Sequence, residues 1–169
     1  MSWTAPTPPE VDGPLIGADR PILQGYLGWQ RRTFLNICAG LTPEQLALRA
    51  IPSSNLSLLG LVRHLTKVER VWFRIRVAGQ DVPPVFRLGT DVDFDQVDPA
   101  EAEDWLGRLV EEVRLADEAV AGVDFETTIQ ARDLTMSLRS VHMHVITEYA
   151  RHNGHADLIR EAIDGVTGR

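Results

Sequence analysis

Residues 137–163 read SLRSVHMHVITEYARHNGHADLIREAI, and they place three histidines and a glutamate on one face of a predicted helix. Counted at about 100° per residue from Glu148, His152 lies about 40° to one side and His144 about 40° to the other. His155 lies about 20° from Glu148 on the same count. The stretch therefore predicts a long helix with a polar stripe in its middle.

The same line continues through Val141 and Ile159, which are apolar and are expected to face a core. Glu148 and the histidines then turn inward with them. Burying a carboxylate and imidazoles without partners costs several kcal/mol. A divalent cation removes that cost, because it binds carboxylate and neutral imidazole directly. Glu148 and His152, spaced i and i+4, are thus candidate ligands of one ion, and an intrahelical hydrogen-bonded pair is the alternative.

A third ligand must come from another helix, and His64 is the candidate. It lies in a helix predicted over Ser57–Ala78, on an inward stripe whose other members are apolar: Gly60, Val68, Val71 and Ile75. A core histidine with satisfied hydrogen bonds is the alternative. Three protein ligands leave coordination positions open for water or substrate, as in catalytic rather than structural metal sites.

The rest of the chain predicts an all-α fold. Amphipathic helices are expected over residues 19–39, 57–78, 98–120 and 137–163, with a short connecting helix from Thr42 and a short extended piece within 123–136. This order predicts a four-helix bundle of up-down helices, with a long crossover loop between the second and third. The crossover contains the motif Asp91-x-Asp93-x-Asp95, which lacks the glycine and glutamate of a calcium loop and predicts a solvated acidic loop.

The composition is that of one globular domain. The chain has 169 residues, 44% of them hydrophobic and 24% charged. Residues 1–18 contain four prolines and predict an N-terminal arm, and residues 19–169 the bundle domain. No membrane segment or signal peptide is expected. The single cysteine, Cys38, excludes an internal disulfide and favours a cytoplasmic protein. The net charge of −7 argues against a nucleic-acid partner, because the basic pair Arg31-Arg32 is short and lies beside acids.

Two stretches carry a family resemblance: residues 57–65 (SLLGLVRHL) with the residues that follow them, and residues 148–157 (EYARHNGHAD). Together and in this order they resemble the DinB/YfiT-like metal-binding four-helix-bundle superfamily, in its branch related to mycothiol-dependent enzymes. The resemblance implies a bundle, often dimeric, that holds a divalent metal with three side chains. The matching positions here are His64, Glu148 and His152. Many members have histidine where this chain has Glu148, whereas the mycothiol-dependent isomerase branch has glutamate. Many also have glutamine in place of His155.

The resemblance also implies thiol chemistry. Characterised relatives include transferases and isomerases that use mycothiol, bacillithiol or glutathione. The expected protein is thus a homodimeric, metal-dependent S-transferase or isomerase that joins a small-molecule thiol to an electrophilic substrate, with zinc or nickel as the metal. All but one of the 17 basic residues are arginine, which is typical of GC-rich bacterial genomes and favours mycothiol as the thiol.

The catalytic group is not assigned by these patterns, and His155 and His144 are the candidates. Arg151, about 60° from Glu148, borders the same face and predicts a contact with an anionic group of the thiol cofactor or substrate, with a surface ion pair as the alternative. Two other functions stay open. One is a non-enzymatic, stress-related metal-binding bundle with His144 or His155 as a fourth ligand. The other is a metal-assisted hydrolase with one of these histidines as base.

Overall fold

The computed structural model describes residues 3–87, 90, 92–131 and 133–167, and it is mostly helical. Its long helices are α1 (Asp19–Cys38), α3 (Leu58–Glu69) continued by the π-helix η1 (Arg70–Val77), α4 (Ala102–Val120) and α5 (Leu138–Asp164). Its shorter elements are α2 (Pro43–Ala47), the 3₁₀-helix η2 (Pro99–Glu101), and the antiparallel strands β1 (Thr128–Ala131) and β2 (Leu134–Ser137). These bounds confirm the all-α prediction, and the extended piece becomes a two-stranded ribbon.

Local signals explain where the helices begin and end. The hydroxyl of Ser57 accepts a hydrogen bond from the backbone of Gly60 at the start of α3, and Ser137 caps α5 in the same way. Gly165 ends α5 with φ of 77°, a left-handed conformation that glycine adopts without a Cβ clash. Helix α1 begins at Asp19 as its first helical residue, and no side chain caps that end.

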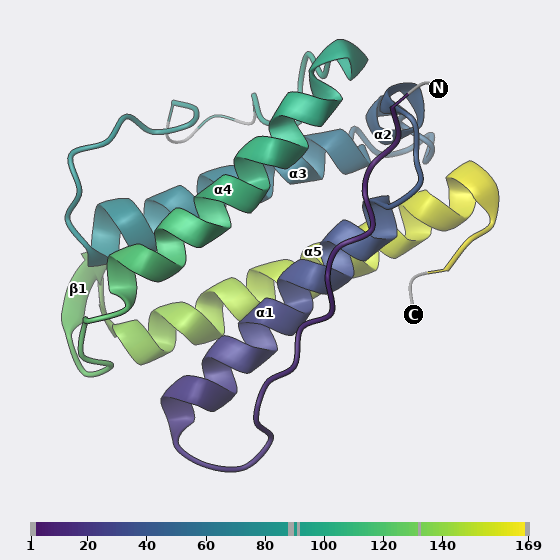
Figure 1. Cartoon of the computed structure of the whole chain (residues 1–169). Helices are drawn as coiled ribbons and strands as arrows, with labels where there is room; N and C mark the ends of the chain where they lie inside the picture. The colour runs from purple at the N-terminus through teal and green to yellow at the C-terminus, as the bar shows by residue number, and fades with distance from the viewer. Residues whose placement is uncertain (1–2, 88–89, 91, 132, 168–169) are drawn as a thin grey trace.

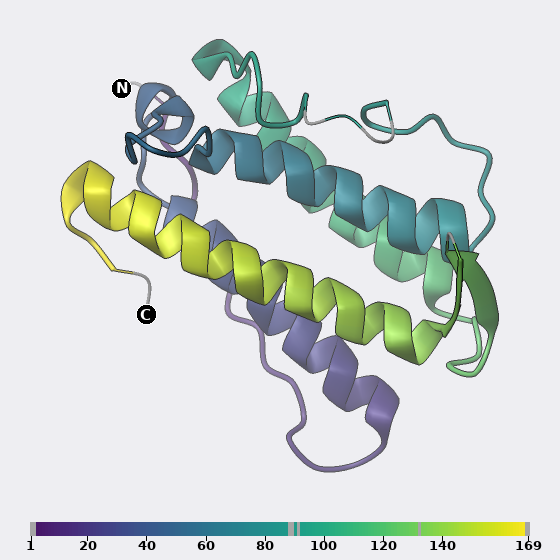
Figure 2. The same ribbon diagram turned by 180° about the vertical axis from the view of Figure 1, so that it is seen from behind.

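The long helices pack side by side (Figures 1 and 2). Asn153 on α5 donates to the backbone oxygen of Gln30 on α1, and Arg160, two turns later, donates to that of Ile37. Because the residue numbers of these contacts increase along both helices, α1 and α5 run in the same direction. The chain segment α3–η1 runs antiparallel to α5, because α3 contacts the middle of α5 and η1 contacts its first turns.

Helix α4 runs in the same direction as α3. Arg63 lies 5.5 Å from the Trp105 ring, and Arg70, seven residues later, pairs with Glu112. The connection from η1 to η2 therefore has to carry the chain back along the whole length of α3, as Figure 2 shows. This return path brings the second half of the connection over the N-terminal part of α3, where His64 lies.

The π-helix changes which residues face inward. Val71 is buried as predicted, but Ile75, the next residue of the predicted stripe, is only half-buried, and Phe73 is buried with 1% of its surface exposed. An i→i+5 hydrogen-bond pattern widens the turn, so the 100° count that holds in α3 fails in η1. In this π-helix, the rings of Phe73 and Trp72 pack against α5.

A buried polar network joins all four long helices. The guanidinium of Arg31 on α1 donates to both carboxylate oxygens of Glu69 on α3, at 2.8 and 2.7 Å. Tyr149 on α5 donates to the same carboxylate, and Arg31 also pairs with Asp117 on α4. Arg31 is thus a core residue and not a surface charge.

The N-terminal arm lies along α1 (Figure 1), where Gly13 and Gly25 meet backbone to backbone. A Cβ added at Gly25 would lie 2.9 Å from the Cα of Gly13, so this contact requires glycine. A cavity of about 1360 Å³ lies between the arm, α1 and α4. In the described part of the chain, no helix is both long and apolar enough to cross a membrane.

Candidate metal centre

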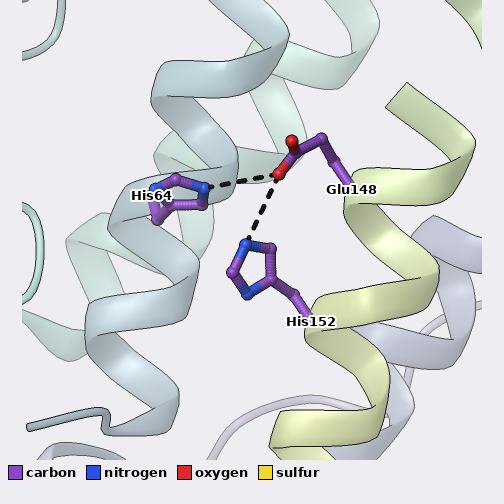
Figure 3. A group of neighbouring side chains, drawn as sticks. All are labelled: His64, Glu148 and His152. Atoms are coloured by element: carbon purple, nitrogen blue, oxygen red, sulfur yellow. Dashed lines mark ion pairs between the residues drawn. The ribbon is translucent and has the colours of Figure 1, made fainter. Parts of the chain in front are cut away.

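The fold brings His64 together with Glu148 and His152, although 84 residues separate the first two in sequence. His64 extends from α3, and the other two extend from successive turns of α5 (Figure 3). One ligand atom from each side chain lies within 4.8 Å of the other two. The cluster could therefore hold a metal ion, as predicted for these residues.

Oxygen Oε2 of Glu148 lies at the centre of the cluster. It is 3.5 Å from Nε2 of His152 and 3.9 Å from Nε2 of His64, the two contacts drawn in Figure 3. Both imidazoles thus turn the same nitrogen toward one carboxylate oxygen. This arrangement turns two imidazole nitrogens and one carboxylate oxygen toward a common point.

The other nitrogen of His64 is held by a buried carboxylate. Nδ1 of His64 lies 2.8 Å from Oδ2 of Asp93, an acid with none of its surface exposed, and Lys67 donates to the same oxygen. Because the carboxylate can only accept, Nδ1 carries a proton, and the neutral ring in this tautomer has its lone pair on Nε2. Burial by itself would raise the pKa of Asp93, but the hydrogen bonds from His64 and Lys67 lower it to about 2.

Asp93 corrects the prediction of a solvated acidic loop. Arg63 on α3 donates to the backbone oxygens of Val92 and Asp95, and the ring of Phe94 stacks on that of His64 at 5.0 Å. These contacts bind the loop to α3. Asp91, the first acid of the motif, lies outside the described residues. Nothing in the local sequence distinguishes Asp93 from its exposed neighbour Asp95. The one sequence feature that indicates a functional loop is the length of the crossover between the second and third long helices.

His155 contacts His152 at the ring nitrogen other than the one that faces Glu148. Its Nδ1 is 3.4 Å from Nδ1 of His152. In the tautomer of neutral His152 that donates from Nδ1 in this contact, the lone pair lies on Nε2, the nitrogen that faces Glu148. Burial, the neighbouring histidines and the charge of Arg151 lower the pKa of His152 to about 3. His152 is therefore neutral at physiological pH, which is the form that binds metal.

His144 approaches Glu148 from the opposite side. Its Nε2 lies 3.7 Å from Oε1 of Glu148, and its ring packs against Trp72 of η1 with centroids 4.3 Å apart. Burial lowers the pKa of His144 below its usual value, against the attraction of Glu148. His144 contacts the outer oxygen and is not one of the three grouped residues.

Arg151 is exposed at the edge of the same face. Within the described part of the chain it makes no ion pair or hydrogen bond, so the surface ion pair considered from the sequence is absent there. His142, which the helical count places off the metal face, is buried between the rings of Phe73 and Phe125 and bonded to the backbone of Leu138.

The residues present fit a divalent cation. Nε2 of His64 is buried and has no hydrogen-bond partner among the described residues, which is costly for a nitrogen lone pair unless something binds it. Two imidazoles and a carboxylate are the donor set of many zinc sites and of sites for other late transition metals. The fold and site thus define a helical protein with a candidate metal cluster between two antiparallel helices.

The family model for Mycothiol-S-transferase matches residues 22–165, which is most of the chain. The protein belongs to this family, which confirms the resemblance to mycothiol-related members of the DinB-like superfamily. Comparison with curated proteins gave no significant match, and neither did comparison with solved structures.

Proposed function

We propose that the protein is a metal-dependent S-transferase that uses mycothiol, with His64, Glu148 and His152 as the metal ligands. The observation that carries this proposal is the buried, unpartnered Nε2 of His64, held toward Glu148 and His152 by Asp93. Membership of the Mycothiol-S-transferase family supports mycothiol as the thiol in this proposal. Zinc or nickel suits the two nitrogen donors and one oxygen donor.

The chemistry follows from the donor set. A bound divalent cation lowers the pKa of a thiol beside it, so it supplies a thiolate nucleophile at neutral pH. Three protein ligands leave room for that thiol. In the transfer, a carbon–sulfur bond forms at the electrophilic substrate while the bond to its leaving group breaks and the leaving group keeps the electron pair. The thiol proton goes to solvent. On the side of His152, whose side chain is 9% exposed, the surrounding protein limits the access of water.

Arg151 is proposed to bind an anionic group of the thiol or substrate. It is an exposed cation three residues after Glu148 and has no ion pair among the described residues. Replacing Arg151 by Met is expected to spare the metal content and to weaken binding of the thiol or of an anionic substrate. Unchanged binding would assign Arg151 to the solvent-exposed surface only.

The wider architecture is part of the same proposal. We infer a bundle domain over residues 19–169 preceded by an arm over 1–18, in the four-helix arrangement of the DinB-like superfamily. A cytoplasmic homodimer is the form expected for the superfamily, and sedimentation of the purified full chain tests the dimer.

Metal analysis and conjugation of mycothiol to an electrophile test the function together. The informative variant is Glu148→Gln, and Glu161→Gln is its control, because Glu161 is an exposed glutamate on the same helix. We expect near-stoichiometric metal and chelator-sensitive conjugation in the wild type and in the control, and loss of both in Glu148→Gln. A wild-type protein that binds no metal at neutral pH contradicts the metal centre. A metal-loaded protein without conjugation to any electrophile in a broad panel contradicts the transferase.

A further inference from the structure

The two oxygens of Glu148 face different partners. Oε2 faces Nε2 of His64 and Nε2 of His152, at 3.9 and 3.5 Å. Oε1 faces Nε2 of His144 at 3.7 Å, on the other side of the carboxylate. A carboxylate can bind a cation through one oxygen or through both. In this arrangement only one oxygen is turned toward the two histidine donors.

His144 is held in place by the π-helix. Its ring meets that of Trp72 with centroids 4.3 Å apart and planes inclined by 54°. The guanidinium of Arg76, one turn along η1, lies 4.1 Å from the centroid of the Trp72 ring. Arg76, Trp72 and His144 thus form a row that ends at the outer oxygen of Glu148. Both Trp72 and Arg76 lie in the π-helix η1, and π-helical turns are frequent at functional sites.

The exposure of the side chains shows which side of the cluster is open. It rises from 9% for His152 and 16% for His64 to 27% for Glu148 and 34% for His144. A cosubstrate that approaches the cluster therefore meets His144 and the outer oxygen of Glu148 first. If that oxygen also bound the ion, it would occupy the coordination position nearest to the open side.

We propose, on the basis of the proposed metal-dependent function, that His144 is a positioning residue that restricts Glu148 to one metal-binding oxygen. The N–H of its Nε2 tautomer attracts Oε1, and the row with Trp72 and Arg76 keeps the imidazole there. The coordination position on the open side then stays available to the thiol. His144 acts through Glu148, and no proton transfer by His144 is needed.

Cobalt substitution measures this directly, because the visible absorption of Co²⁺ weakens as the coordination number rises above four. The proteins are the full-length wild type, His144→Ala, His144→Gln and Thr147→Ala. Thr147 is the control, because it lies next to Glu148 on α5 and its hydroxyl donates to the backbone oxygen of His144, not to the Glu148 carboxylate. Cobalt affinity, the visible spectrum, and mycothiol affinity by calorimetry on the cobalt protein are measured for each.

In His144→Ala we expect cobalt to bind stoichiometrically and no more weakly than in the wild type, because Glu148 gains a second donor atom. The visible absorption should fall, and mycothiol should bind about tenfold more weakly, the size of effect typical for loss of an outer-shell partner. His144→Gln restores an N–H donor and should recover both signals in part, while Thr147→Ala should match the wild type.

A structural role for His144 predicts the opposite pattern, in which cobalt affinity falls and the spectrum is unchanged; that result overturns the proposal. An unchanged spectrum with unchanged mycothiol affinity in His144→Ala also overturns it. A wild-type cobalt protein that does not bind mycothiol contradicts the proposed function itself. The two failures are therefore distinguishable.

Discussion

Replacing Asp93 by Asn is the sharpest test of how the loop supports the candidate metal site. The carboxylate of Asp93 is fully buried, and its Oδ2 accepts hydrogen bonds from Nδ1 of His64 (2.8 Å) and from Lys67. Asparagine has the same size but no charge, so it weakens the bond that orients His64 and leaves the Lys67 cation near the site without its counterion. Both effects disfavour a bound cation.

The magnitude follows from these contacts. Loss of a hydrogen-bonded partner behind a metal-ligating histidine costs about 10- to 100-fold in metal affinity, which corresponds to about 1.4 to 2.7 kcal/mol of binding free energy. The lower figure applies if the asparagine oxygen still accepts from His64. The higher figure applies if the amide turns its nitrogen toward His64, because the ring can then no longer donate from Nδ1.

The assay is competition for zinc with a chromophoric chelator at neutral pH. Asp95→Asn is the matched control, because Asp95 lies two residues away in the same loop but is exposed and pairs only loosely with Arg49, at 3.7 Å. Circular dichroism checks that both variants keep their helices. Zinc affinities of Asp93→Asn and Asp95→Asn that agree within about twofold would refute the reasoning, since they would fall below the range expected for such a partner.

Three further predictions concern the rest of the molecule. Glu69→Gln leaves Arg31 without its buried counterion, so urea denaturation should show a loss of about 3 to 5 kcal/mol; a loss below about 1 kcal/mol would mean that the pair contributes little. Burial lowers the pKa of His142 below 6.5, so the folded state resists protonation while the unfolded state does not. Its contribution to stability is therefore complete above about pH 6.5 and is lost as the pH falls below that value, by up to about 1.4 kcal/mol per pH unit. Metal-free His142→Gln should lose less stability than the wild type between about pH 7 and pH 5, and equal slopes would contradict this. Gly25→Ala should release the arm from α1 and expose it to limited proteolysis, because the added Cβ meets the Cα of Gly13 at 2.9 Å; an unchanged cleavage rate would show that the arm is not held there.

The helices and two of the three cluster positions could be read from local patterns. Apolar spacing, the serine caps and the terminal glycines predict the helix bounds, since these signals act within a few residues of one another. The i, i+4 spacing likewise makes Glu148 and His152 neighbours on the same face of any α-helix. Predicting His64 as a ligand required a further inference, because only its place as the polar member of an otherwise apolar stripe sets it apart.

Other features depended on tertiary structure. Asp93 resembles its exposed neighbour Asp95 in sequence, and it becomes part of the site only because the crossover loop returns over α3. Arg31 and Glu69 look like surface charges until α1 and α3 pack together and bury both. A charge in a sequence carries no information about which partner, far along the chain, will compensate its burial.

The sequence by itself determined the helical class, the places where helices begin and end, and the line of residues that turns inward on α5. Only the tertiary structure decided how far η1 departs from α-helical spacing, which oxygen of Glu148 faces the histidines, and which imidazole nitrogen is left to bind a metal. The physical reason is that periodicity sets the angle of a side chain about its own helix axis. The rotation of one helix against another, and the path of a loop between them, follow from packing contacts that no single segment contains.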